Sequence, residues 1–160
     1  MRPPRFGIVG YKNAGKTTLV CRLVAEFTAR GLRVSTVKHA HSLFDIDREG
    51  TDSHAHRCAG AREVALVGAR RWALMRELRG EAEPSLDAIA DRMGAADLLL
   101  VEGFKRDRHP KIEVRADERR LDPAACPNIV ARVGAGEALG RDDVGPIADL
   151  IARHLALADA

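Results

Sequence analysis

A glycine-rich segment near the start of the chain constrains the fold more than any other feature of the sequence. The stretch GYKNAGKTT, residues 10–18, contains the pattern G-x-x-x-x-G-K-[ST]. An apolar run at residues 6–9 predicts a buried strand over residues 5–9 before it, and apolar side chains at helical spacing over residues 16–30 predict a helix after it. A strand, a loop of this pattern and a helix in this order form a P-loop, in which backbone N–H groups and the helix N-terminus bind phosphate. The sequence therefore predicts a nucleoside triphosphate site here.

The residue types in the loop suit separate tasks in binding a triphosphate. Gly10 and Gly15 allow the backbone to approach the phosphate oxygens closely. Lys16 is expected to neutralise the β and γ phosphates and to act in catalysis, and the hydroxyl of Thr17 is expected to bind Mg²⁺. Lys12 is either a second phosphate lysine or a solvated loop residue. The predicted nucleotide-binding residues are Gly10, Tyr11, Lys12, Asn13, Ala14, Gly15, Lys16, Thr17 and Thr18.

The rest of the chain predicts an α/β fold. A second strand at residues 33–38 completes a βαβ unit, whose strands are parallel. Residues 71–78 fit either a helix or a hairpin partner of the preceding strand, and we favour the hairpin. The short helix at residues 52–61 is expected to be capped by Asp52 or Ser53. Further strands are predicted over 63–67, 97–101, 111–115 and 128–133, and further helices over 84–93 and 144–157.

The fold class is therefore predicted to be α/β, with a P-loop NTPase fold: a mainly parallel sheet flanked by helices, plus an additional β-hairpin segment. The length of 160 residues suits a single P-loop nucleotide-binding domain over residues 1–160. The net charge of +3, from 26 basic and 23 acidic residues, is too even for a generic nucleic-acid binder. No segment is long and apolar enough to span a membrane. Three scattered cysteines suit a reducing compartment, so we expect a cytoplasmic protein.

Acidic residues after two of the predicted strands are candidates for the chemistry of the site. Ligands of an open parallel sheet bind beyond the carboxyl ends of its strands. Glu102, after the apolar run DLLLV, is expected to hold a metal-bound water or to orient the attacking water, and so to serve in catalysis and as a metal ligand. Asp45 and Asp47 either contribute to Mg²⁺ binding or solvate a turn. Thr17, Glu102 and Asp47 are thus the predicted metal residues.

Other polar groups have weaker functional signals. Two H-x-H pairs, at residues 39–41 and 54–56, lack a thiolate partner, so phosphate or partner contacts or ordinary surface positions are favoured over zinc. The basic run FKRDRHPK, residues 104–111, either receives a second anionic ligand or is a solvated loop. Trp72 is expected in the core or at an interface.

Taken together, these motifs resemble the molybdopterin-guanine dinucleotide biosynthesis adapter family, MobB. The resemblance covers most of the chain and rests on GYKNAGKTT, on KHAH with the following D-I-D, on GTDSHAHRCAGA, on RRWALM, and on DLLLVEGFK with PKIEV. It implies a GTP-binding protein with at most weak Mg²⁺-dependent GTPase activity. It also implies a partner nucleotidyltransferase that joins GMP to molybdopterin and a homodimer formed through the β segment around residues 71–75. Molybdopterin itself is a further candidate partner, and the sequence leaves open whether it contacts this chain.

The residues alone leave other functions open. The N-K-x-D signature of ordinary GTPases is missing from the sequence, so guanine specificity is implied by the resemblance alone. A small-molecule kinase would use the same loop, with residues 104–111 as a lid over an acceptor. A nucleotide-gated interaction module of another pathway is a third possibility.

Overall fold

The computed structural model of the chain describes residues 2–40 and 46–157, so that His41 and Asp45 lie outside the described residues. The contacts within the chain group into two compact units. The first comprises the residues up to His39 and from Ala90 onward, and the second comprises Ala40–Ile89. The single domain expected from the chain length stays a prediction, and each unit is described by itself.

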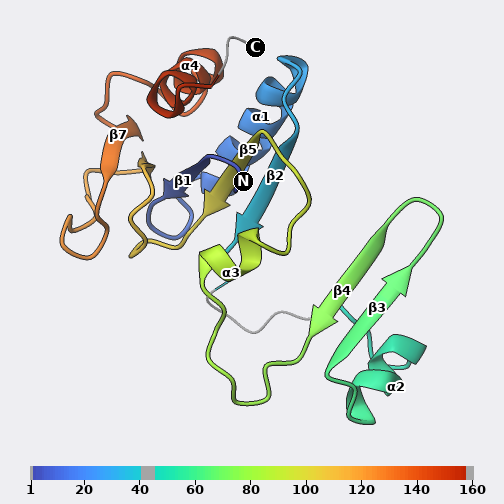
Figure 1. Ribbon diagram of the computed structural model, residues 1–160. Helices are drawn as coiled ribbons and strands as arrows, with labels where there is room; N and C mark the ends of the chain where they lie inside the picture. Colours follow the sequence, from blue (N-terminus) through green and yellow to red (C-terminus); the bar gives the residue numbers. More distant parts are fainter. Residues whose placement is uncertain (1, 41–45, 158–160) are drawn as a thin grey trace. The chain divides into compact units, whose positions relative to one another are not determined.

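The first unit is built on a parallel sheet of five strands (Figure 1). The strands lie in the order β2-β5-β1-β6-β7, and every neighbouring pair is parallel. This arrangement brings the carboxyl ends of all five strands to one edge, the edge at which an open parallel sheet binds its ligands. The strands are β1 (Arg5–Val9), β2 (Val34–Lys38), β5 (Leu98–Glu102), β6 (Lys111–Arg115) and β7 (Ile129–Gly134).

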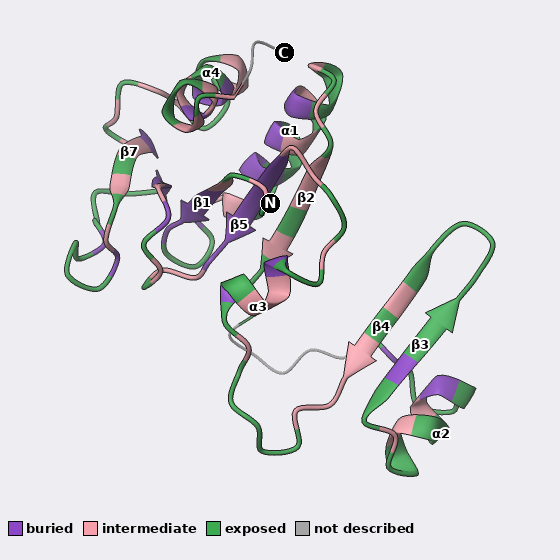
Figure 2. Cartoon of the chain, viewed as in Figure 1, coloured by how far each residue is buried: buried purple, intermediate pink, exposed green. Residues whose placement is uncertain are grey.

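Two helices, α1 (Lys16–Ala29) and α4 (Val144–Leu155), pack on one face of this sheet. Apolar side chains of β1, β5 and β6 join those of the two helices in one buried cluster. The strand β5 is buried along its whole length, and the purple of β1 and β5 in Figure 2 marks this core. The members with no solvent exposure are Phe6, Ile8, Leu23, Phe27, Leu98, Leu100, Ile112, Val133, Ile147, Ala148 and Ile151.

The opposite face of the sheet is covered partly by the segment between β6 and β7. Leu121 and Cys126 of this segment pack with Val9 of β1 in a smaller buried cluster. On β6, Ile112 belongs to the main core, and the alternation of a strand points its neighbour Glu113 to the covered face. The charged side chains of β6 are therefore buried as well.

The second unit contains the helix α2 (Asp52–Cys58) and an antiparallel hairpin, β3 (Glu63–Val67) with β4 (Trp72–Arg76). The helix α3 (Leu86–Ala90) ends at the boundary between the units. In the hairpin, Val64 is buried, whereas most other side chains are exposed or half-buried (Figure 2). The hairpin predicted for residues 71–78 is thus confirmed.

The structure corrects two details of the sequence-based prediction. The helix α2 is capped by Thr51, whose hydroxyl accepts a hydrogen bond from His54 N at 3.4 Å, and not by Asp52 or Ser53. Ser53 lies inside the helix, where its hydroxyl donates to Asp47 at 2.5 Å. The helix predicted over residues 84–93 is shorter, Leu86–Ala90, and nothing in the structure explains its early end. Among the described residues, no helix combines the length and the apolar character needed to cross a membrane.

Candidate nucleotide-binding site

The loop between β1 and α1 adopts a backbone conformation that requires glycine at two positions. Gly10 has φ +150°, and a Cβ at this position would lie 2.4 Å from the carbonyl oxygen of Val114 on β6. Gly15, which precedes α1, has φ +95°. Any side chain at Gly10 would collide with the backbone, and one at Gly15 would be strained, so both positions require glycine. Asn13 has φ 64°, a conformation that asparagine tolerates better than most residues.

Lys16 lies over the loop rather than away from it. Its Nζ donates to the carbonyl oxygen of Tyr11 at 2.6 Å. Partial burial lowers the pKa of Lys16, and the nearby carboxylate of Glu102 opposes this effect. Among the described residues, no carboxylate is a direct hydrogen-bond partner of this ammonium group, so a phosphate could replace the Tyr11 carbonyl as its ligand.

Thr17 and Glu102 meet at the start of α1. The Thr17 hydroxyl lies 3.0 Å and 3.1 Å from the two carboxylate oxygens of Glu102. The register between β1 and β5 pairs Glu102 with Ile8, so the carboxylate emerges beside the loop. Lys38, paired with Glu102 across β2 and β5, donates from Nζ to Thr17 Oγ1 at 3.2 Å and lies 3.2 Å from Glu102 Oε1.

These oxygens fit a magnesium ion. Mg²⁺ keeps most of its water and takes only one or two oxygens from a protein, often a hydroxyl and a carboxylate beside substrate phosphates. Thr17 and Glu102 supply this pair, and the ammonium of Lys38 already lies against both oxygens. Among residues 2–40 and 46–157, no group of three or more His, Cys, Asp or Glu side chains could hold a metal.

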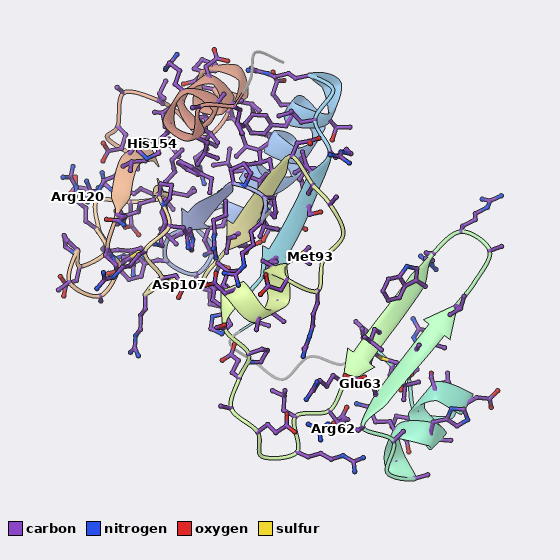
Figure 3. All side chains as sticks on the ribbon, viewed as in Figure 1. Arg62, Glu63, Met93, Asp107, Arg120 and His154 are labelled. Atoms are coloured by element: carbon purple, nitrogen blue, oxygen red, sulfur yellow. The ribbon has the colours of Figure 1, made fainter. Side chains whose placement is uncertain are left out.

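Tyr11 connects the loop to cationic side chains from two other segments. Its hydroxyl donates to the carbonyl oxygen of Arg120 at 3.3 Å, and Arg120 is labelled in Figure 3. The guanidinium of Arg119 lies 4.7 Å from the centre of the Tyr11 ring, and Lys105 Nζ lies 5.8 Å from it. Such distances permit cation–π attraction. The surroundings of Tyr11 are therefore basic, as an anionic ligand requires.

Arg141, between β7 and α4, contacts the loop from the β7 side of the sheet. Its Nη1 donates to the carbonyl oxygen of Ala14 at 3.2 Å. A Cβ on Gly15 would lie 3.2 Å from the same nitrogen. Gly134, which ends β7, has φ +105° and no room for a Cβ, which would lie 2.1 Å from the carbonyl oxygen of Arg115. The chain therefore turns closely at Gly134 before it reaches Arg141.

The basic run at residues 104–111 divides into exposed and buried parts. Lys111 has no solvent exposure, and its Nζ donates to the carbonyl oxygens of Asp107, His109 and Pro127. His109 is 8% exposed, and neither ring nitrogen has a hydrogen-bond partner in the described part of the chain. Burial, together with the charges of Lys111 and Arg5, lowers the pKa of His109 to about 4. These two side chains fix the loop, so the whole run is not a solvated surface segment.

Asp47 belongs to the second unit, where its carboxylate supports α2. It accepts hydrogen bonds from Ser53 at 2.5 Å and from Thr51 at 3.2 Å, and Arg57 Nε lies 3.5 Å away. The structure thus assigns Asp47 contacts within its own unit, and its predicted role as a magnesium ligand stays a prediction. His54 and His56 lie on α2 in the same unit, whereas His39 stacks against Phe104 with a centroid distance of 4.7 Å.

The structure brings most of the predicted site residues together at one edge of the sheet. Residues 10–18 form the loop and the first turn of α1, with Lys12 and Thr18 exposed, and Glu102 joins them through Thr17. Sequence reasoning missed the contacts of Lys38 and Arg141. The signal for Lys38 was its place at the end of a strand beside the strand of Glu102. Arg141 carried no comparable signal.

Comparisons with known proteins identify the family of the chain. Residues 6–135 match the family model described as molybdopterin guanine dinucleotide synthesis protein B. The chain is 43% identical over 117 residues to the molybdopterin-guanine dinucleotide biosynthesis adapter protein of Haemophilus influenzae, which is 72% of this chain and 65% of the relative. It is 40% identical over 116 residues to the protein of that name from Escherichia coli, 71% of this chain and 66% of the relative. The chain thus spans slightly less than two thirds of the length of each.

Solved structures match over almost the whole chain. A crystal structure of molybdopterin-guanine biosynthesis protein B superposes with a TM-score of 0.76 at 29% identity and covers 94% of this chain and 99% of its own. The MobB structure from Bacillus subtilis has a TM-score of 0.72 at 25% identity and covers 95% and 98%. The family model also matches well over half of the residues of this chain. The chain therefore belongs to the family of molybdopterin guanine dinucleotide synthesis protein B and has the P-loop NTPase fold of that family.

Proposed function

We propose that this chain is a GTP-binding adapter that assists a pterin nucleotidyltransferase in attaching GMP to molybdopterin. The observation that carries the nucleotide part is the contact between the Thr17 hydroxyl and the Glu102 carboxylate at the start of α1. This contact joins the phosphate loop to a strand-end carboxylate, as nucleoside triphosphate and Mg²⁺ require. The adapter part is supported by relatives that are named biosynthesis adapter proteins.

Phosphate binding in this proposal depends on the loop and on Lys16. The N–H groups at the start of α1 face the triphosphate, where the positive end of the helix dipole attracts its charge. Lys16 exchanges the carbonyl oxygen of Tyr11 for the β and γ phosphate oxygens. A neutral acceptor is thereby replaced by an anionic one, which strengthens the hydrogen bond. Bound Mg²⁺ neutralises charge on the phosphates, and Thr17 and Glu102 would hold it.

Hydrolysis in this proposal is slow. Glu102 orients a water molecule, but its carboxylate is already engaged by Thr17 and Lys38. An arginine finger raises the rate of phosphoryl transfer by about 10³- to 10⁵-fold. Arg141 is held on the carbonyl side of the loop at Ala14, a position that does not suit this role. The protein is therefore proposed to be at most a weak Mg²⁺-dependent GTPase, active in the cytoplasm.

The proposed partners are a pterin nucleotidyltransferase, molybdopterin and a second copy of the chain. The homodimer is proposed to form through the hairpin, whose side chains Leu66, Val67, Trp72 and Leu74 are between 45% and 83% exposed. Val67 lies opposite Trp72, and Leu74 lies opposite Ala65 on the same face. Apolar side chains gathered in this way on a two-stranded sheet are typical of an interaction surface.

Thermal unfolding with Mg²⁺ and GTP, ATP or no nucleotide tests nucleotide binding. A ligand at about 100 times its Kd adds about 2.7 kcal/mol to the free energy of unfolding, which raises the Tm by several degrees. We expect a rise with GTP that disappears in Lys16→Ala, because that variant lacks the phosphate-binding ammonium. A Lys16→Ala protein that still responds to GTP would refute the proposed loop chemistry.

The same assay separates the adapter from its main rival. A rise in Tm with ATP alone, with steady phosphorylation of a small acceptor, would favour a kinase. Glu102→Gln should leave GTP binding largely intact and slow hydrolysis, measured as phosphate release. Unchanged phosphate release would exclude the role of Glu102 in orienting water. Capture of a pterin nucleotidyltransferase by the GTP-loaded protein tests the adapter role.

A further inference from the structure

Arg141 is placed to contact the nucleoside of a bound nucleotide. We propose that its guanidinium donates to the guanine base, so that this side chain determines the preference for GTP over ATP. The proposal rests on the nucleotide binding proposed above. The phosphate loop binds the triphosphate, which GTP and ATP share, so a residue outside the loop must recognise the base.

The order of the strands determines where the nucleoside lies. Thr17 and Glu102 gather on the β5 side of the loop, where they would hold a metal ion that neutralises charge at the γ end of the triphosphate. The γ end of the triphosphate therefore points toward β5. The nucleoside, at the opposite end, extends toward β6 and β7, because these strands lie on the other side of β1.

Arg141 occupies this β7 side and is fixed to the loop itself. One of its nitrogens donates to the carbonyl oxygen of Ala14 at 3.2 Å and lies against Gly15, next to the first residue of α1. Phosphate binding uses N–H groups of the loop, so a group bound to the Ala14 carbonyl can remain in place while the phosphates are held. Arg141 would then be beside the nucleotide rather than beneath its phosphates.

The guanidinium has donors left to offer. Within residues 2–40 and 46–157, the bond to Ala14 is its one hydrogen bond, and no carboxylate pairs with it. The adjacent acidic residues are engaged elsewhere: Asp142 pairs with Arg22, and Asp143 accepts from Gly140 N at 2.7 Å. Arg141 is also solvent-exposed, so a ligand can reach it.

The chemistry of these donors favours guanine. Guanine presents two acceptors, O6 and N7, that match the planar donor fork of an arginine, whereas adenine presents an amino group in place of O6. An arginine that reads this edge discriminates between the two bases without the N-K-x-D signature, which the sequence lacks. Inorganic tripolyphosphate has no base, so its binding should not depend on Arg141.

Equilibrium titrations of GTP, ATP and tripolyphosphate in the presence of Mg²⁺ test the proposal. For Arg141→Ala we expect the Kd for GTP to rise at least tenfold, the Kd for ATP to change less, and that for tripolyphosphate to stay within twofold. Arg141→Lys keeps the charge and reaches the Ala14 carbonyl, but it lacks the fork, so it should also lose preference for GTP. Arg141→Lys therefore tests the proposal even if the Arg141→Ala protein does not fold. Arg153→Ala, which removes an exposed arginine from α4, is the matched control and should bind all three compounds normally.

Each other outcome overturns the proposal in a distinguishable way. Equal losses for GTP and tripolyphosphate would place Arg141 on the phosphates, and equal losses for GTP and ATP would show that it does not read the base. Unchanged binding would leave it a structural contact of the loop. A wild-type protein that binds none of the three would overturn the proposed function itself, and this proposal with it. Wild-type binding that is lost in Lys16→Ala but normal in Arg141→Ala would overturn this proposal alone.

Discussion

The five-stranded sheet and the β3–β4 hairpin distribute charged and apolar side chains in opposite ways. In the sheet, the strand β6 buries charged residues almost completely, whereas the hairpin exposes large apolar ones. The buried charged residues are Lys111, Glu113 and Arg115, and the exposed apolar residues are Leu66, Val67, Trp72 and Leu74.

The buried charges of β6 are tolerated because each has partners. Lys111 donates to three backbone carbonyls. Glu113 accepts from the backbone of Leu121 at 2.6 Å and from Arg132 at 2.9 Å. Arg115 pairs with Glu137. A buried charge with such partners avoids most of its desolvation cost, so these residues attach the loops around the nucleotide site to the sheet.

The hairpin has no comparable solution within its own unit. A two-stranded sheet can cover one face with a helix but leaves the other in solvent, and an isolated hairpin is only marginally stable. The sheet is thus a complete folding unit, whereas the hairpin presents a surface that another chain could cover.

The largest effect is expected from shortening a central leucine of the sheet. Leu100 on β5 has no solvent exposure, so Leu100→Ala should lower the free energy of unfolding by about 3 to 5 kcal/mol. Leu74→Ala in the hairpin is the matched control, because Leu74 is 50% exposed, and should cost less than about 1 kcal/mol in the monomer. Urea denaturation measures both. Similar losses for the two variants would contradict the contrast between the units.

A smaller loss is expected when the buried lysine of β6 is replaced. Lys111→Met keeps most of the volume but leaves three carbonyl oxygens without their donor, which should cost roughly 2 to 3 kcal/mol in urea denaturation. Arg106→Met, at an exposed position of the same loop, is the control and should be within about 0.5 kcal/mol of wild type. A Lys111→Met protein as stable as wild type would show that the desolvation cost of the ammonium cancels its hydrogen bonds.

His109 should make the stability of the sheet depend on pH. Its pKa is about 4 in the folded protein and 6.5 ordinarily, so the unfolded chain binds the extra proton between these values. The contribution of neutral, buried His109 to the free energy of unfolding is fully present above pH 6.5 and is lost as the pH falls toward 4. The free energy of unfolding changes by at most about 1.4 kcal/mol per pH unit in this range. Denaturation midpoints across this range measure it. His109→Phe should flatten the slope, and His56→Phe at an exposed position should not; equal slopes in all three proteins would contradict the assignment.

The contrast between the units also explains what the sequence could and could not predict. The strand, loop and helix over residues 5–30 were predictable because the local pattern G-x-x-x-x-G-K-[ST] demands that backbone, and Glu102 followed from its place after an apolar strand. Those predictions use local order and the topology of parallel sheets. The contacts of Lys111 and Arg141 could not be predicted in this way, because their partners are backbone carbonyls, which every type of residue has.

The prediction that Asp52 or Ser53 caps α2 was wrong for a different reason. Thr51, Asp52 and Ser53 are all good N-cap residues, so sequence alone does not choose among them. The structure begins the helix at Asp52, so that Thr51 directly precedes it and its hydroxyl accepts from His54 N. A shift of one residue in the start of a helix changes which residue is the cap, and residue type does not fix that start.

The smallest effect on monomer stability, and the sharpest test of the contrast, is expected in the hairpin. Trp72 is 69% exposed, so Trp72→Glu should change the free energy of unfolding of the monomer by no more than about 0.5 kcal/mol. If a second copy covers the face that Trp72 shares with Val67, the new carboxylate would be buried without a partner, and the dimer should dissociate at concentrations where the wild-type protein is dimeric.

Sedimentation equilibrium measures the dissociation, and Glu83→Gln, outside the hairpin, should not affect it. Unchanged association would show that the dimer interface does not include this face of the hairpin. The exposed apolar side chains would then be a contact surface for a different protein. Dissociation without a loss of stability would show that the hairpin contributes to assembly and little to the folding of the single chain.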